Sequence, residues 1–211
     1  MQNEIKDIVT LLKLQDEIRE KYLVEDLLGN NIKILLILES PHIDEILCKY
    51  PVAGDTGIEI SKSILDNIDK PIGKYIKDNL DSSIFGIMNC CQIPMQESPY
   101  CYQLMNQELL NSFKTIRNTK VNVKKRNDKY IRDIDNEIYK NLRNRLTYIL
   151  EKSDIKLIIP CGRMANYFVN KCSNLTENFK ICNNIPHPAR NNWSGNKRIK
   201  ILKQFIERTI K

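Results

Sequence analysis

The stretch IKILLILESPH, residues 32–42, decides the fold of this 211-residue chain. Residues 32–38 form an apolar run that is broken only by Lys33. Short runs of this kind are typical of central strands in a parallel sheet, because such strands are buried on both faces. The run ends abruptly at Glu39-Ser40-Pro41-His42, so polar side chains follow the expected strand directly.

Three further runs resemble this strand, and segments with apolar residues at helical spacing separate them. The strand candidates are IFGIM, IKLII and the weaker FKIC, at residues 84–88, 155–159 and 179–182. The helical patterns cover residues 58–68, 71–79, 102–113, 130–152, 163–171 and 195–210. Strands that alternate with helices favour parallel pairing. The sequence therefore predicts an α/β fold: a three-layer α/β/α sandwich around a central, mainly parallel four-stranded sheet.

The length suits a single domain over residues 1–211. Apolar residues recur at helical spacing over residues 4–28, and Gly29-Asn30 follows as a helix stop. Residues 1–29 are therefore expected to be an N-terminal helical extension. Residues 114–129 are polar, basic and weakly periodic, and are expected to be a mobile loop or an insertion.

Composition excludes several classes of protein. With 42% hydrophobic and 28% charged residues, the chain reads as a globular protein and not as a disordered one. It contains no run of 18 apolar residues, which a membrane-spanning helix requires. The N-terminus, MQNEIKDIV, lacks the apolar core of a signal peptide. Together with an odd number of cysteines, seven, these features predict a cytoplasmic protein with free thiols.

The formal net charge of +7 is distributed unevenly along the chain. Residues 1–113 carry a net charge of −8, residues 114–189 carry +9 and residues 190–211 carry +6. Positive charge gathered in the second half of the chain favours a polyanionic partner, most simply a nucleic acid. A solvated lysine-rich surface explains the same charges, and the charge alone leaves both interpretations open.

In open parallel α/β sheets, ligands bind beyond the carboxyl ends of the strands. The expected strands place Glu39, Ser40 and His42 there, then Asn89, then Gly162-Arg163, and finally His187. Both histidines of the chain belong to this set, and histidine is well suited to acid–base work near neutral pH. Glu39 follows an apolar run and is partly shielded from water, which suits a general base. A structural pair with Arg163 or with a helix N-terminus would explain its position equally well.

Five short segments occur in a fixed order within residues 30–210. They are LESPH, PVAGDTG, MNCCQIP, PCGRMA and HPA, at residues 38–42, 51–57, 88–94, 160–165 and 187–189. In this order they resemble the motifs of the uracil-DNA glycosylase superfamily, above all those of its bacterial branch that carries an iron–sulfur cluster. The resemblance implies an enzyme that flips a nucleotide out of DNA and hydrolyses its N-glycosidic bond.

The resemblance also implies roles for individual residues. His187 would donate a hydrogen bond to the base and stabilise its departing negative charge, and Glu39 would orient or activate the attacking water. The base-binding residues would be Ser40, Pro41, His42, Val52, Gly54 and Asn89. The DNA-binding residues would be Arg163, the wedge loop Arg190, Asn191, Asn192 and Trp193, and the basic residues Lys124, Lys125 and Arg126. For Trp193, a place in the core is an alternative that the sequence favours at least as much.

Three departures from the family pattern change these expectations. Residues 1–47 contain no cysteine, so the first ligand pair of the iron–sulfur branch is missing, and we expect no cluster, no other metal and no cofactor. Val52 replaces a base-stacking aromatic residue, and His42 replaces a glycine. Both changes suggest a bulkier modified pyrimidine as the substrate, as found in some phage DNA, and a role in restricting foreign DNA.

The sequence thus favours a monomeric, monofunctional DNA glycosylase that acts on uracil or on a bulkier modified pyrimidine. The alternative is a non-catalytic module on the same fold that binds modified DNA or a nucleotide. An enzyme that acts on free nucleotides is a third possibility, which the basic segments at residues 114–129 and 190–211 argue against.

Overall fold

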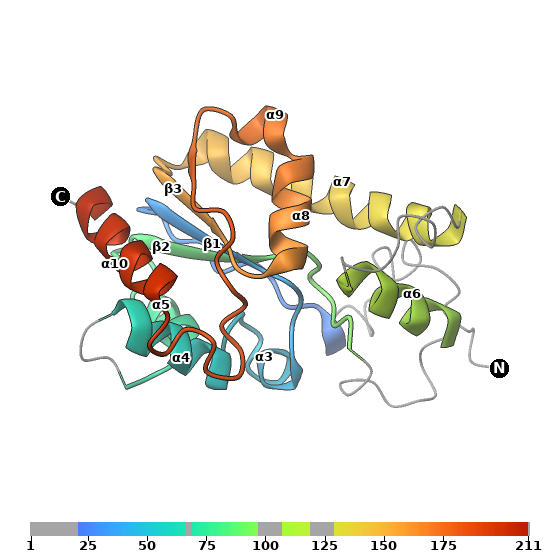
Figure 1. Ribbon diagram of the computed structural model, residues 1–211, viewed down its shortest axis with the longest axis horizontal. Coiled ribbons are helices and arrows are strands. Elements are labelled where there is room, and N and C mark those ends of the chain that lie inside the picture. The colour runs from blue at the N-terminus through green and yellow to red at the C-terminus, as the bar shows by residue number, and fades with distance from the viewer. Residues whose placement is uncertain (1–20, 66–68, 97–106, 119–128, 211) are drawn as a thin grey trace.

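The apolar run at residues 32–38 forms the central strand of a parallel sheet in the computed structural model (Figure 1). The structure describes residues 21–65, 69–96, 107–118 and 129–210. The strands are β1 (Ile34–Leu38), β2 (Phe85–Asn89), β3 (Leu157–Pro160) and the short β4 (Lys180–Ile181). Their order in the sheet is β2-β1-β3-β4, and every pairing is parallel. The four predicted strands and their parallel arrangement are confirmed.

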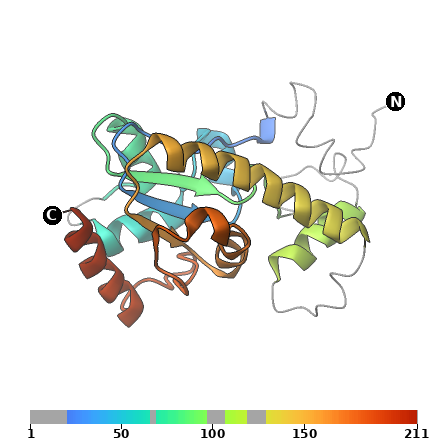
Figure 2. The same cartoon turned by 90° about the horizontal axis from the view of Figure 1, so that it is seen from above.

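Helices cover both faces of this sheet, as Figures 1 and 2 show. One face packs against α7 (Lys129–Lys152) and α8 (Arg163–Lys171), with α6 (Gln107–Arg117) joining the same cluster. The other face packs against α4 (Asp55–Ile64), α5 (Ile72–Asp78) and α10 (Lys197–Ile210). Alternate residues of β1 enter the two clusters, so the strand is buried on both sides. The three-layer α/β/α sandwich is therefore confirmed.

Two short helices were absent from the predicted pattern. They are α3 (Ile43–Cys48), which follows β1, and α9 (Ser173–Thr176), which follows α8. Both are too short to show a clear apolar period. Of these two, α3 matters for the site, because His42 is its N-cap residue and Glu45 lies in its first turn.

The expected N-terminal helix is wrong over residues 23–29. Leu27 instead forms an antiparallel bridge with Ile87 of β2, with two backbone hydrogen bonds of 2.9 Å between the two residues. The backbone N–H of Val24 donates to Gln92 O at 2.9 Å. This segment pairs with the outer edge of β2, and the gain from covering an open sheet edge outweighs the local helical pattern. Residues 1–20 lie outside the described part of the chain.

The expected loop at residues 114–129 is also corrected in part. Residues 114–117 form the last turn of α6, and Lys129 begins α7. The rest of the segment, residues 119–128, lies outside the described residues. Within the described ranges, every helix is too short or too polar to cross a membrane.

Candidate active site

The first three strands end level with one another, which brings their following residues together. Leu38 pairs with Asn89, and Ile37 pairs with Pro160. Beyond the ends, the N–H of Cys90 donates to Leu38 O at 2.9 Å, and the N–H of Cys161 donates to Ile37 O at 2.8 Å. Glu39, Asn89 and Gly162 therefore lie at one edge of the sheet, as the sequence predicts.

Two cavities open at this edge, and His187 lines both of them. The smaller, which we call the strand-end pocket, has a volume of about 330 Å³. It is lined by Ser40, His42, Glu45, Val52, Gly54, Asn89 and Arg190, among others. The larger, which we call the arginine cavity, has a volume of about 750 Å³. It is lined by Glu39, Arg117, Arg163, Asn192 and Arg198, among others.

The strand-end pocket has buried polar atoms without partners. Asn89 is 2% exposed and Ser40 is 8% exposed. Asn89 Nδ2 donates to Glu45 Oε1 at 3.4 Å, which orients the amide and leaves Oδ1 as an unused acceptor. Ser40 Oγ likewise has no hydrogen-bond partner among the described residues. Because buried polar atoms are nearly always hydrogen-bonded, these atoms indicate a site for a polar ligand.

Glu45 of α3 holds one wall of this pocket, a role that we did not predict. Its carboxylate accepts the N–H of His42 at 2.7 Å and the N–H of Val52 at 2.8 Å. Burial raises the pKa of this carboxyl above its usual value. The spacing from His42 to Glu45 is that of a capping box, but histidine is not a usual N-cap residue, so the sequence pattern did not reveal this role.

Val52 lies in the wall of the strand-end pocket with an unusual backbone conformation. It is 2% exposed, and its φ of 48° falls in the left-handed region. That conformation is a strained one for a β-branched residue, and strain of this kind concentrates at ligand sites. The hydrogen bond from its N–H to Glu45 helps to hold the strained turn in place.

Arg145 of α7 holds the end of β2 through hydrogen bonds to its backbone. Its Nη1 contacts both carboxylate oxygens of Asp26 at 2.7 Å, and its Nη2 donates to Asn89 O at 2.9 Å and to Cys90 O at 3.1 Å. The side chains of Arg145 and Asp26 are only 17% and 8% exposed. The pair thus positions the backbone of Asn89 without lining the strand-end pocket itself.

We expect Arg145→Leu to lower the free energy of unfolding by about 3–5 kcal/mol, because it leaves the carboxylate of Asp26 buried and unpaired. Urea titration measures this change. The matched control is Arg208→Leu on the exposed surface of α10, for which we expect a change below about 0.5 kcal/mol. If Arg145→Leu lowers the free energy of unfolding no more than the control does, the Arg145–Asp26 pair does not stabilise the fold as proposed.

His187 is held in one orientation by its own loop. Its Nδ1 accepts the N–H of Ala189 at 3.2 Å, so the neutral ring carries its proton on Nε2. Asn192 Nδ2 donates to His187 O at 3.2 Å and to Ala189 O at 2.7 Å, and Ser194 N–H donates to Glu59 of α4 at 2.6 Å. Burial lowers the pKa of His187, and this effect outweighs the nearby charge of Glu39. The ring is therefore prepared to donate a hydrogen bond as a neutral imidazole.

Gly162, at the start of α8, allows the close approach of His187. Its φ is 93°, and a Cβ at this position would lie 3.1 Å from His187 Cβ and 3.2 Å from Cδ2. The N–H of Gly162 also donates to Ile185 O at 2.8 Å. This bond joins the end of β3 to the loop at residues 182–196, which carries His187 and which we call the histidine loop.

We therefore expect Gly162→Ala to displace the imidazole and to strain the turn. The rate of any reaction that depends on His187 should fall by at least tenfold, while Gly195→Ala, at a glycine with a similar φ of 67° and open space around it, should leave the rate nearly unchanged. Equal rates for the two variants would show that the placement of His187 does not depend on Gly162.

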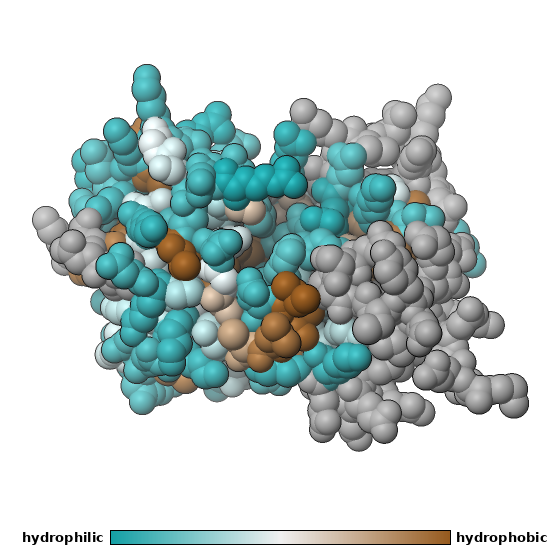
Figure 3. All heavy atoms as spheres, turned by 90° about the horizontal axis from the view of Figure 1, so that it is seen from below, coloured by the Kyte–Doolittle hydropathy of each residue, from teal (hydrophilic) through white to brown (hydrophobic). Residues whose placement is uncertain are grey.

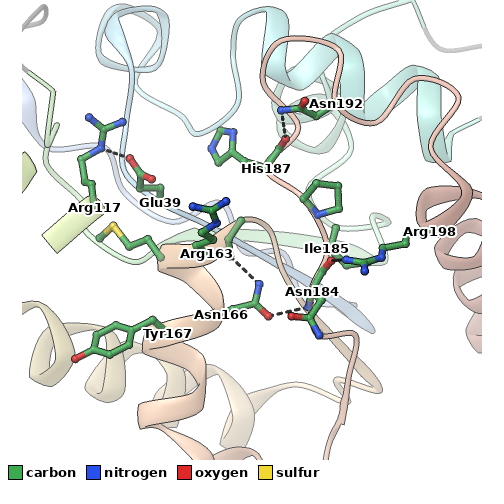
Figure 4. Close-up of a pocket in the computed structure, with 13 residues that line it drawn as sticks. Glu39, Arg117, Arg163, Asn166, Tyr167, Asn184, Ile185, His187, Asn192 and Arg198 are labelled. Atoms are coloured by element: carbon green, nitrogen blue, oxygen red, sulfur yellow. Dashed lines mark hydrogen bonds and ion pairs between the residues drawn. The ribbon is translucent and has the colours of Figure 1, made fainter. Parts of the chain in front are cut away.

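Glu39 lies in the arginine cavity and forms an ion pair with Nε of Arg117 (Figure 4). The sequence suggested Arg163 or a helix N-terminus as a structural partner, and the observed partner is instead Arg117 at the end of α6. Arg163, the first residue of α8, is exposed in the same cavity, and Arg198 donates from Nη1 to Asn184 O at 3.1 Å. Arg117 and Arg198 were not predicted as site residues, since their distance in the sequence from the strand ends hides their proximity.

The other predicted residues are distributed as follows. Pro41 is buried beside the pocket but does not line it. Arg190 and Asn191 are exposed at the tip of the histidine loop, with φ values of 61° and 56°. The predicted DNA contacts Lys124, Lys125 and Arg126 lie outside the described residues.

Trp193 is the one predicted contact that the structure contradicts. It is 1% exposed, packs in the core on the α4 side of the sheet, and donates from Nε1 to Pro186 O at 2.7 Å. It cannot act as a wedge in DNA without leaving the core, so the wedge assignment is wrong and the core alternative is correct. The indole instead anchors the histidine loop.

The face that carries α3 and α4 is mostly hydrophilic, with a few apolar groups (Figure 3). On α3, Ile43 is 45% exposed and Leu47 is 76% exposed. Ile43 lies between His42 and Asp44, which both line the strand-end pocket. Apolar surface beside this pocket is therefore supplied by α3 and not by Trp193.

The described cysteines do not form a metal site. Cys90, Cys91, Cys161 and Cys172 are buried, and burial raises the pKa of each thiol, to about 11 for Cys91 and Cys172. No three His, Cys, Asp or Glu side chains in the described ranges lie close enough together to hold a metal ion. Cys101 lies outside those ranges. Among the described residues, the donor set therefore does not fit a four-cysteine iron–sulfur cluster.

Comparison with known proteins supports the fold. No family model matches the sequence, and no curated protein matches it. Among solved structures, the chain is similar to the solution structure of a putative uracil DNA glycosylase from Methanosarcina acetivorans, with a TM-score of 0.51 and 14% sequence identity. The match covers 90% of this chain and 99% of that one. The chain therefore has a uracil-DNA glycosylase-like α/β fold.

Proposed function

We propose that this protein is a DNA glycosylase that flips a pyrimidine-type nucleotide out of DNA and hydrolyses its N-glycosidic bond. The observation that carries the proposal is the strand-end pocket, where unpartnered Asn89 Oδ1 and Ser40 Oγ occur together with His187. A pocket of about 330 Å³ is at the small end of the range for ligand sites, which suits a single base.

The reaction follows from the two cavities that meet at His187. The C1′–N1 bond breaks and its electron pair leaves with the base, so negative charge develops on a base carbonyl. The Nε2–H of His187 would donate to that carbonyl and stabilise the charge. Water adds to C1′ and gives a proton to the carboxylate of Glu39, which lies on the side of the arginine cavity. The same carboxylate would orient this water and stabilise the cationic sugar, and the departing base anion would take up a proton from solvent. Asn89 Oδ1 would accept a hydrogen bond from a donor on the base edge.

The finer part of the proposal concerns the base. Val52 is aliphatic and in the pocket wall, and His42 lines the same pocket where the family motif has glycine. An aliphatic side chain leaves more room beside a pyrimidine than an aromatic ring does. We therefore propose that the enzyme prefers a bulkier modified pyrimidine, in phage DNA, over plain uracil.

The test is base release from duplexes that contain uracil, hydroxymethylcytosine or a glucosylated base, with abasic sites detected after alkaline cleavage. Release of a modified base faster than uracil supports the full proposal. Fast release of uracil alone keeps the glycosylase and refutes the modified-base preference. The ion pair of Glu39 with Arg117 favours a second candidate, a non-catalytic DNA-binding module, and binding without abasic product on every duplex would select it.

A further inference from the structure

Arg117 connects the candidate catalytic carboxylate to a basic cavity. Its Nε pairs with Glu39, and in Figure 4 the two terminal nitrogens point away from that carboxylate. No described residue bonds these terminal nitrogens. A guanidinium presents its five donors in a planar fork, so one edge can hold a carboxylate while the other binds a second anion.

The surroundings favour an anion as the second partner. Arg117, Arg163 and Arg198 all line the arginine cavity, and Glu39 is the only acidic residue among its lining residues. The start of α8, a nine-residue helix, also faces this cavity through Gly162 and Arg163, which adds the positive end of a helix dipole. The arginine cavity therefore keeps an excess of positive charge after Glu39 has neutralised one of its three arginines.

Because His187 lines both cavities, a DNA phosphate is the anion that fits best. If a flipped base enters the strand-end pocket, its sugar lies near His187, and the phosphates bonded to that sugar lie next to the arginine cavity. We propose that Arg117 is a positioning residue that binds a DNA phosphate with its terminal nitrogens and, through Nε, fixes Glu39 for the attack of water. The inference rests on the proposed glycosylase function. It gives the Glu39–Arg117 pair a purpose in catalysis, because one guanidinium would hold both the carboxylate and the bound strand, and so would fix their relative positions.

The substitution Arg117→Lys distinguishes the phosphate contact of Arg117 from its contact with Glu39. Arg117→Lys keeps the positive charge but has one nitrogen in place of three, so it should bind the phosphate and lose the hold on Glu39. Arg117→Gln should lose both. Arg208→Gln, on the exposed surface of α10, is the matched control.

Two quantities are measured on the duplex that the wild-type protein cleaves fastest: the single-turnover rate at saturating DNA, and the slope of log Kd against log salt. For Arg117→Gln we expect the rate to fall at least tenfold. We expect the magnitude of the salt slope to decrease by about 1, the change that the loss of one phosphate contact produces. For Arg117→Lys we expect a similar loss of rate with a slope near the wild-type value. The double variant Glu39→Gln/Arg117→Gln should cleave no slower than Glu39→Gln alone, since Arg117 acts through Glu39.

The inference is overturned if the wild-type protein releases base and Arg117→Gln releases it equally fast at saturation, or if lysine restores both quantities. A circular dichroism melt of each variant, compared with Arg208→Gln, separates loss of function from loss of fold. If the wild-type protein releases no base from any duplex, the proposed function itself fails and the inference fails with it. The two failures are thus distinguishable by the wild-type arm alone.

Discussion

We expect His187→Ala to lower the rate of base release by about 10²–10³-fold, the usual effect of removing one donor to a developing negative charge. The imidazole lines the strand-end pocket, Nδ1 is occupied by the N–H of Ala189, and no described residue bonds Nε2. The single N–H of the neutral ring, on Nε2, is therefore available to donate to a ligand in the pocket. Single-turnover cleavage at saturating DNA measures the loss.

The affinity for DNA is the control for this variant. Since the ring carries no charge near neutral pH, His187→Ala should leave Kd for DNA within about threefold of wild type and leave its salt slope unchanged. A variant that cleaves within threefold of the wild-type rate would contradict the role of the imidazole. A variant that loses binding and cleavage together would instead indicate that the loop has collapsed.

The pH dependence of the wild-type protein follows from the buried ring. Burial lowers the pKa of His187 below the ordinary value of 6.5. The neutral, donating form therefore persists as the pH falls through 6.5, and we expect the cleavage rate to be retained there. In the unfolded chain the ring takes up a proton at its ordinary pKa, so protonation favours unfolding as the pH falls below 6.5. Part of the stability should be lost in that window in wild type and retained in His187→Ala.

The sheet and its polar edge were predictable because their signals are local. The burial of β1 on both faces produces an apolar run that can be read directly from IKILLIL, and parallel strands bring the residues after each run to one edge. The placement of Glu39, Asn89 and His187 at the edge of the sheet was predicted from this property of parallel strands. The N-terminal segment was misjudged because pairing of Leu27 with the edge of β2 is a tertiary contact that no local period reveals.

Two of the missed residues, Arg117 and Arg145, have partners that are distant in the sequence. Arg117 lies 78 residues from Glu39, and Arg145 lies 119 residues from Asp26. The wedge assignment of Trp193 failed for a related reason, since its position in the loop fits both a DNA contact and a core anchor. Only the packing of α4 and α10 against the same face of the sheet decides between them.

We expect Glu39→Gln to lower the rate of base release by about 10²–10⁴-fold, the range for loss of a group that activates water. Glutamine keeps the size of the side chain and an oxygen that can accept from Nε of Arg117, so the fold and the pocket should persist. In the proposed mechanism, the variant would lose the negative charge that stabilises the cationic sugar and the base that accepts the proton of the attacking water. Glu207→Gln, exposed on α10, is the matched control and should cleave at the wild-type rate.

The charge of Glu39 also makes a prediction about DNA binding that separates catalysis from steering. Removing a negative charge from a cavity lined by three arginines should tighten DNA binding and leave Kd equal to or below the wild-type value, even as cleavage is lost. Tighter binding with slow cleavage is the pattern of a group used in the transition state and not in the ground state. Wild-type cleavage by Glu39→Gln would instead make the carboxylate a structural partner of Arg117, and near-normal turnover in both Glu39→Gln and His187→Ala would remove the mechanism altogether.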